Sequence, residues 1–201
     1  MIKISNTSKM PCISWSLPAI ETCPGAFENG ELVEVCDNCY ADKGFYVMES
    51  VRAPRLHNMK DWKREDWVSD MITLLEKRKL FRWFDSGDMY TVNLANKIFE
   101  VVKNTPHCKH WLPTRMYKFK KFEKILNKIN SLPNIAVRLS SDSTIGVTIH
   151  VKGFVNSTVV PKNTLALNNA WLCPSSKNKN KCGDCRACWN KEVKTVAYIN
   201  H

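Results

Sequence analysis

The cysteines of this chain of 201 residues have a spacing that suits metal binding. Three of the nine lie near the N-terminus, at Cys23, Cys36 and Cys39. Four more lie near the C-terminus, at Cys173, Cys182, Cys185 and Cys188. The first residues do not resemble a secretory segment, and in a reducing cytoplasm grouped cysteines indicate metal ligands or reactive thiols rather than disulfides. We therefore expect the two groups to bind metal, as one or two 4Fe–4S clusters.

The C-terminal group has the spacing of an iron–sulfur ligand run. In Cys182-Gly-Asp-Cys185-Arg-Ala-Cys188, three thiols follow one another at two-residue gaps on one loop. Cys173, which is followed by a proline, supplies a fourth thiol. Ferredoxin-type clusters use a run of the same kind. Zinc sites more often pair two separated Cys-x-x-Cys turns, so zinc is the alternative metal here.

The N-terminal group offers three thiols, which leaves one iron of a four-iron cluster without a protein ligand. A substrate or cofactor can chelate such an open metal position, whereas a closed site is structural. A fourth protein ligand would close the site, and the candidates are Cys12, Cys108, His107 and His110. The last three belong to one run just before a predicted strand, which we interpret as structural. Zinc is again the alternative to iron.

From residue 61 onward, helix-like and strand-like segments alternate. Apolar residues recur at helical spacing in three segments, 63–79, 91–103 and 117–130, and Asp61 is the expected N-cap of the first. Strand-like runs lie between and after these helices, at 81–84, 109–113 and 134–139. Shorter β-branched segments follow at 146–151, 157–160 and 164–167. Alternating strands and helices predict βα units and a parallel sheet.

These elements predict an α/β protein built on a partial (β/α) barrel-like parallel sheet. An open α/β sheet fits the same pattern. We expect one domain over residues 1–201. Within it, residues 1–60 form a cysteine-rich N-terminal metal-binding loop region, residues 61–168 form the βα scaffold, and residues 169–201 form the C-terminal cluster-binding segment.

Polar residues follow three of the predicted strands. They are Asp85, Ser86, Gly87 and Asp88 after the first strand, Thr114 and Arg115 after the second, and Ser140, Ser141 and Asp142 after the third. The C-terminal ends of parallel strands build the active face of such folds. We therefore expect a small-molecule site at this edge. Turn formation and helix capping are the alternative use of the same residue types.

The net charge of +11 is unevenly distributed along the chain. Residues 103–128 carry eight basic residues and one acid. Such a surface attracts polyanions, so nucleic acid is a candidate partner, through Lys118, Lys120, Lys121, Lys124 and Lys128. A solvated helix face is the alternative interpretation. No apolar stretch reaches the roughly 18 residues of a membrane span, so we expect a cytoplasmic protein without membrane contact.

Several motifs together resemble the bacteriophage family known as gene product 88. They are Ser14 to Pro18, Cys23-Pro24-Gly25, Cys39 to Tyr46, Phe81 to Asp88, Trp111 to Arg115, Val137 to Ser140 and the closing run from Cys173 to Trp189. The resemblance covers nearly the whole chain. It implies a phage-encoded, cysteine-rich iron–sulfur protein in the cytoplasm of an infected bacterial host, and it supplies no reaction.

A weaker resemblance is to radical S-adenosylmethionine enzymes, which have a three-cysteine loop, an aromatic residue beside a cysteine and a partial (β/α) barrel. Tyr40 follows Cys39 here, and Ser86-Gly87-Asp88 stands where those enzymes have Gly-Gly-Glu. The resemblance implies that this triplet binds the methionine amine and that Ser140 and Ser141 contact the ribose. The 12 residues between Cys23 and Cys36 depart from the compact spacing of that family.

Three functions fit the sequence. The first is an iron–sulfur enzyme, radical S-adenosylmethionine-like or another oxidoreductase, in which Asp85, Asp88, Arg115 and Arg138 orient a ligand beside an open N-terminal cluster. The second is a nucleic-acid-binding protein stabilised by zinc or a cluster. The third is an electron carrier or iron store without a substrate. Polar residues at the strand ends favour the first, because a carrier needs none of them.

Overall fold

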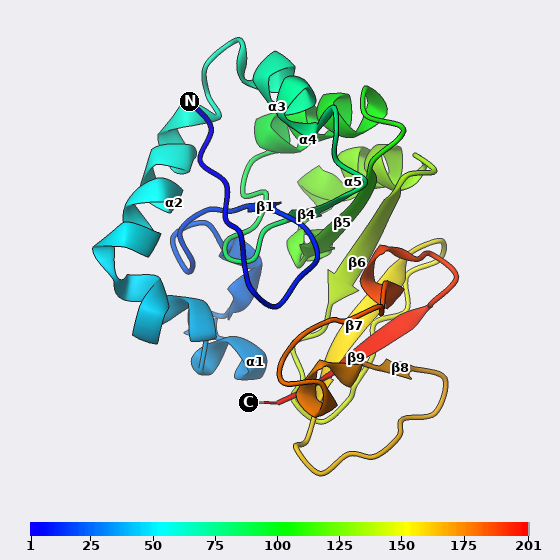
Figure 1. Cartoon of the computed structure of the whole chain (residues 1–201). Helices are drawn as coiled ribbons and strands as arrows, with labels where there is room; N and C mark the ends of the chain where they lie inside the picture. The colour runs from blue at the N-terminus through cyan, green and yellow to red at the C-terminus, as the bar shows by residue number, and fades with distance from the viewer. Residues whose placement is uncertain (201) are drawn as a thin grey trace.

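The computed structural model describes residues 1–200 and is organised around a parallel sheet (Figure 1). The sheet has seven strands, in the order β1 (Ser14–Trp15), β4 (Leu80–Trp83), β5 (Lys109–Thr114), β6 (Ile135–Ser140), β7 (Val155–Val160), β9 (Thr195–Ile199) and β8 (Trp171–Leu172). Every neighbouring pair is parallel. The predicted α/β class is therefore confirmed. β1 and β8 form the two edges, so the described strands make a partial barrel-like sheet and not a closed barrel.

Helices cover one face of this sheet. They are α2 (Glu49–Asp61), α3 (Trp67–Leu75), α4 (Val92–Lys103) and α5 (Glu123–Asn130). Figure 1 shows α3, α4 and α5 gathered on one side of the strands. Alternate side chains of a strand point to the same face of a sheet. Phe81 and Trp83 of β4 therefore both point to the helices, where they are fully buried in the core. Trp15 of β1 completes an aromatic cluster with Trp67 and Trp83.

The opposite face of the sheet is covered by the C-terminal cysteine segment instead of helices. A 3-10 turn at Ala187–Trp189 packs against β5 and β6. Trp189 lies edge-to-face on Trp111 at 5.3 Å, and its indole nitrogen donates a hydrogen bond to the carbonyl of Phe81 at 2.9 Å. The C-terminal cysteine segment is therefore attached directly to the strands through Trp189.

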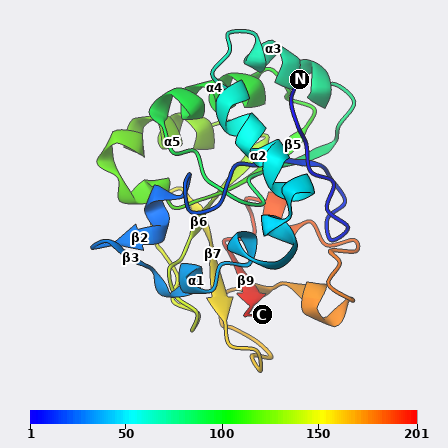
Figure 2. The ribbon, with the colours of Figure 1, turned by 90° about the vertical axis from the view of Figure 1, so that its left-hand side faces the viewer.

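The segment between β1 and α2 carries Cys23, Cys36 and Cys39. It contains the two-stranded hairpin β2 (Phe27–Glu28) and β3 (Glu31–Leu32), followed by the short helix α1 (Glu34–Asp37). Figure 2 shows these three elements together, below α4 and α5. Among the described residues, none of the helices is long and apolar enough to cross a membrane.

The predicted strands at 81–84, 109–113 and 134–139 are confirmed as β4, β5 and β6, and the segment at 157–160 lies within β7. The segments at 146–151 and 164–167 are irregular, and β8 and β9 were not predicted. The helix predicted at 91–103 is α4, which Thr91 caps by accepting a hydrogen bond from the amide of Leu94. The other two predicted helices are shorter, as α3 and α5.

Two predictions about the first third of the chain were wrong. Residues 49–61 form the 13-residue helix α2, where the sequence showed no helical periodicity. The reason is that this helix buries polar side chains, Arg55 and Asn58, against the sheet. Asp61 ends α2 and does not cap the next helix, for which Asp66 occupies the N-cap position.

Candidate metal centres

The N-terminal cysteines lie over the C-terminal ends of the central strands. The turn at Cys23 to Gly25 is pressed on Arg115, which follows β5. A Cβ atom on Gly25 would come within 2.5 Å of the Cβ of Arg115 and 2.9 Å of its carbonyl oxygen, so only glycine fits there. The amide of Val35 in α1 donates to the carbonyl of Asp142, after β6, at 3.1 Å. The loop is therefore fixed to the edge where a site was predicted.

The three N-terminal thiols are close enough to influence one another. Burial raises the pKa of Cys23 to about 12, and negative charges on Asp88, Cys39 and Cys36 act in the same direction. Burial also raises the pKa of Cys36, against the opposing effect of the Arg115 guanidinium. Both thiols are neutral at pH 7 without a bound cation. Binding of a metal here therefore releases protons, as metal binding by thiols generally does.

The four C-terminal cysteines are held by contacts to both ends of the chain. The amide of Cys173 donates to the carbonyl of Ala197 in β9 at 2.8 Å, and the amide of Cys182 donates to the carbonyl of Lys9 at 2.9 Å. The sulfur of Cys188 lies 3.2 Å from the hydroxyl of Tyr198. Burial raises the pKa of Cys188 to about 11. These contacts attach the C-terminal cysteines to the sheet and to the N-terminal segment, and their binding of metal stays a prediction.

Two arginines, Arg138 and Arg82, lie near the C-terminal group. Arg138 of β6 is fully buried and donates five hydrogen bonds to backbone carbonyls; the acceptors are Asn156, Ala187, Cys188, Asn190 and Val193. Arg82 of β4 stacks on Trp111, with its guanidinium carbon 4.3 Å from the ring centroid. Arg138 was predicted to orient a ligand at the strand ends, but its side chain instead holds the loop of Cys188.

Neither of these two guanidinium groups has an acidic partner. Within residues 1–200, the ion pairs of arginine involve Arg55, Arg64 and Arg115 only. Arg82 donates to the carbonyl of Phe84 at 3.1 Å and to the sulfur of Met10 at 3.2 Å. Neither arginine of the helix-free face therefore forms an ion pair among the described residues, and the charge of Asp85 acts on Arg82 only at longer range.

The candidates for a fourth N-terminal ligand lie elsewhere. Cys12 is buried in one cluster with Trp111 and Trp189, against which Cys188 packs, so it belongs beside the C-terminal group. Cys108 and His110 lie at the N-terminal end of β5, at the edge of the sheet opposite the N-terminal cysteines. Burial lowers the pKa of His110 to about 3, and its ring nitrogen lies 2.9 Å from the hydroxyl of Thr105. The ring of His107 contacts the carbonyl of Leu75 at 3.1 Å, which agrees with a structural role for this run; that it binds no metal stays a prediction.

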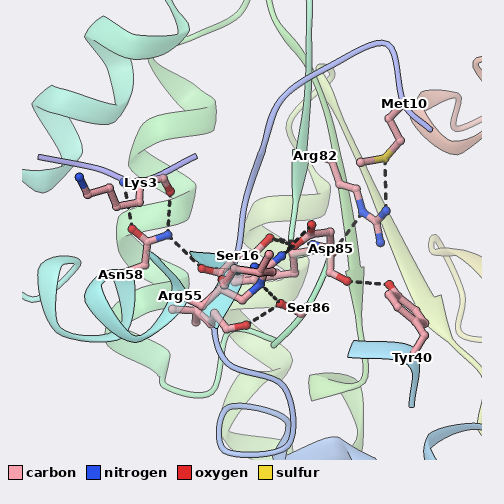
Figure 3. Close-up of polar contacts among 12 residues, drawn as sticks. Lys3, Met10, Ser16, Tyr40, Arg55, Asn58, Arg82, Asp85 and Ser86 are labelled. Carbon is pink, nitrogen blue, oxygen red and sulfur yellow. Dashed lines mark hydrogen bonds and ion pairs between the residues drawn. The ribbon is translucent and has the colours of Figure 1, made fainter. Parts of the chain in front are cut away.

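The predicted polar residues after β4 bind one another and the first segment of the chain (Figure 3). Arg55 of α2 forms an ion pair with Asp85 at 3.2 Å and donates to the hydroxyl of Ser86 at 2.7 Å. Ser16 donates a short hydrogen bond to Asp85. The hydroxyl of Tyr40 donates to the carbonyl of Asp85 at 2.6 Å, which ties the N-terminal cysteine loop to β4.

Gly87 and Asp88 hold the turn after β4 in place. Gly87 has a φ of +79°, and a Cβ atom there would lie 2.6 Å from the Cβ of Leu17. The carboxylate of Asp88 accepts hydrogen bonds from the hydroxyl of Thr114 at 2.9 Å and from the amide of Arg115 at 2.8 Å. Burial raises the pKa of Asp88 to about 6. The two residues therefore connect the ends of β4 and β5.

The residues after β6 complete this edge. Arg115 donates to the carboxylate of Asp142 at 3.0 Å and to the carbonyl of Ser141 at 2.7 Å. The carbonyl of Ser140 accepts a hydrogen bond from Tyr117 at 3.1 Å. The structure thus brings the predicted strand-end residues together, but their polar atoms are bonded to the protein itself. Their contact with a cofactor stays a prediction.

The thiols are grouped without converging on a point. All nine cysteines are free. Over residues 1–200, no three His, Cys, Asp or Glu side chains come close enough together to hold one metal ion.

Sequence reasoning missed Arg55, Arg82 and Tyr198 as parts of these regions. A signal for Arg82 was present, because Phe81-Arg82-Trp83 places a charge inside an apolar strand. Arg55 gave no such signal, since it lies in a polar helix.

The basic stretch is only partly free to meet a polyanion. Lys118 forms an ion pair with Asp142 at 2.5 Å, and the ammonium group of Lys128 lies 4.0 Å from the ring centroid of Phe99. Lys120, Lys121 and Lys124 are exposed beside and on α5.

Comparison with known proteins gives one match. A family model described as gene product 88 matches residues 2–191, a span that includes all nine cysteines. No curated protein matches the chain, and no solved structure matches it.

Proposed function

The chain belongs to the gene product 88 family, and from this premise we propose that it is a phage-encoded iron–sulfur protein of the host cytoplasm. The C-terminal cysteines bind a closed 4Fe–4S cluster, and the N-terminal cysteines bind a second cluster with one open iron. The observation that carries this proposal is that seven cysteines from the two ends of the chain lie against one sheet, with two arginines that form no ion pair near Cys188.

Charge supports the C-terminal cluster. A four-iron cluster with four thiolate ligands is an anion. An isolated buried charge is costly, and a buried cation normally has an anionic partner. Arg82 and Arg138 have no such partner among the side chains of residues 1–200, and an anionic cluster beside Cys188 would supply it. The four donors are all thiols, which is the donor set of iron–sulfur clusters and of structural zinc.

The spacing of the cysteines along the chain supports a cluster over zinc at the C-terminal group. Three thiols follow one another at two-residue gaps, and a fourth is followed by a proline, as in ferredoxin-type ligand runs. Structural zinc sites more often pair two separated Cys-x-x-Cys turns.

The open N-terminal cluster would make the protein an enzyme. A small chelating molecule, S-adenosylmethionine by resemblance, would bind the open iron at the edge formed by Asp88, Arg115 and Asp142. Calorimetry on the anaerobically reconstituted protein tests this step. We expect S-adenosylmethionine to bind the reconstituted chain and not the triple variant Cys23→Ser, Cys36→Ser, Cys39→Ser. Equal heats for both would exclude cofactor binding at this group.

A second proposal concerns the partner. The exposed lysines 120, 121 and 124 suit contact with phosphates, so we propose nucleic acid as the class of macromolecule that α5 meets. Binding should weaken steeply with salt, and a triple Lys→Gln variant should lower the slope. Binding that does not depend on salt would exclude these contacts.

Metal and sulfide analysis of the anaerobically purified chain tests the main proposal. We expect about four irons and four sulfides for each occupied group, with broad absorption near 400 nm. A matched control is Cys108→Ser, which changes a buried cysteine outside both groups. Zinc without sulfide, or no metal, would overturn the iron–sulfur proposal.

A further inference from the structure

The side chain of Tyr198 approaches a ligand sulfur of the C-terminal group. Its hydroxyl lies 3.2 Å from the sulfur of Cys188, within hydrogen-bond distance for sulfur. Tyr198 lies on β9, and the sheet holds its backbone through the register with Val159 of β7. The position of the hydroxyl is therefore fixed by the sheet rather than by the loop that carries the cysteine.

The two unpaired arginines lie around the same sulfur. Arg138 donates to the carbonyl of Cys188 at 3.0 Å and to the carbonyl of Ala187 at 2.6 Å. Arg82 stacks on Trp111, which belongs to the apolar cluster against which Cys188 packs. One ligand thus has a hydroxyl donor and two positive charges around it.

The N-terminal group has a different environment. Arg115, whose charge lowers the pKa of Cys36 against the effect of burial, forms an ion pair with Asp142. The carboxylate of Asp88 lies near Cys23. Positive charge there is already balanced by carboxylates. Hydrogen bonds to cluster sulfurs and net charge both set the reduction potential of a cluster. A hydrogen-bond donor and nearby arginines without an ion pair favour the reduced, more negative state of a cluster.

We propose that the C-terminal centre is a reversible one-electron centre whose reduction potential is raised by Tyr198, Arg82 and Arg138 above that of the N-terminal centre. This inference depends on the proposed iron–sulfur function. Tyr198 is a positioning residue in it, because the residue acts through the sulfur of Cys188 and not as a metal ligand.

A potentiometric titration followed by electron paramagnetic resonance tests this inference on the full chain. Tyr198→Phe removes the hydroxyl and keeps the ring. We expect a roughly tenfold fall in the ratio of reduced to oxidised C-terminal cluster at fixed potential, a shift of about 59 mV for one electron. The matched control Tyr117→Phe removes a hydroxyl that binds the carbonyl of Ser140, and it should leave this potential unchanged.

The outcomes separate the inference from the proposed function. Absence of iron and sulfide in the wild-type chain overturns both. Normal iron and sulfide with the same potential in Tyr198→Phe overturns the inference alone. If Tyr198→Phe loses its iron, the variants Arg82→Met and Arg82→Lys test the inference instead. A reduction potential that is lower in Arg82→Met but not in Arg82→Lys supports it. Equal potentials in the two variants overturn it.

Discussion

The N-terminal cysteines lie over the ends of β4, β5 and β6, where nearby arginines form ion pairs with carboxylates, whereas the C-terminal cysteines lie near two arginines that form none among the described residues. Arg55 is paired with Asp85, and Arg115 is paired with Asp142. Arg82 and Arg138 instead bind carbonyls, a sulfur and an aromatic face. The two groups of cysteines therefore lie near arginines of two kinds, those in ion pairs and those that bind only uncharged groups.

This difference indicates different roles for the two regions. The C-terminal region suits a closed anionic group, since positive charge is present before any ligand binds. The N-terminal region has balanced charges and three thiols at a sheet edge, so it suits a group with a position left for another molecule. Substitutions that change one region at a time distinguish these two roles.

Replacing Arg138 with leucine should have the largest effect. Five carbonyls would lose their donor in a fully buried place, and unsatisfied buried acceptors cost about 1–3 kcal/mol each. After relaxation we expect a loss of about 3–5 kcal/mol in the free energy of unfolding, measured in urea. Arg78→Leu, at an exposed position, is the control and should cost little. Equal stability of the two variants would contradict the anchoring role of Arg138.

Asp88→Asn should change the pH dependence of stability. The pKa of Asp88 in the folded chain, about 6, lies above that in the unfolded chain. The folded state therefore binds the proton more tightly, and the contribution to stability is full below about pH 4 and lost as pH rises through about 6. The contribution of Asp88 to the free energy of unfolding is roughly 3 kcal/mol at most.

Urea unfolding from pH 4 to pH 7 measures this contribution as the difference between the wild type and Asp88→Asn. The exposed Asp37→Asn is the matched control. If the free energy of unfolding depends on pH equally in the wild type and in Asp88→Asn, the carboxylate of Asp88 is not the source of that dependence.

Gly25→Ala should loosen the N-terminal region alone. The added Cβ would overlap the backbone of Arg115, and overpacking of this kind costs about 1–3 kcal/mol. We expect faster proteolysis of the loop around Cys36 and loss of metal from the N-terminal group, with the C-terminal group unaffected. Loss of metal from both groups would mean that the two regions are not independent.

Cys12→Ala should have the smallest effect. Cys12 is buried beside the C-terminal group, and we interpret it as a core residue rather than a ligand. Cys12→Ala should lower the free energy of unfolding by about 1 kcal/mol, and Cys108→Ala should lower it by a similar amount. Neither variant should change the iron content. A fall in iron for Cys12→Ala but not for Cys108→Ala would make Cys12 a ligand.

Much of the scaffold could be predicted from the sequence because its apolar pattern matches its burial. β4, β5 and β6 are largely apolar strands, and α4 has a clear apolar face. The polar residues at the strand ends were predicted to meet at one edge, and they do. These elements follow local rules of periodicity.

The rest depended on contacts that no local pattern records. α2 was missed because it buries Arg55 and Asn58 rather than apolar side chains. The neighbours of Cys12 could not be predicted, since segments 9–12 and 182–189 meet only in the folded chain. Nor could spacing along the chain show that Asp88 and Ser86 are already bonded within the protein.

The most direct test is the iron and sulfide content of two variants beside the wild type, all purified without oxygen. One variant has Cys23, Cys36 and Cys39 replaced by serine, and the other has Cys182, Cys185 and Cys188 replaced. We expect about eight irons in the wild type and about four in each variant, because each group binds its own cluster. Metal content that is unchanged in both variants, or an absence of iron and sulfide in the wild type, would contradict the account.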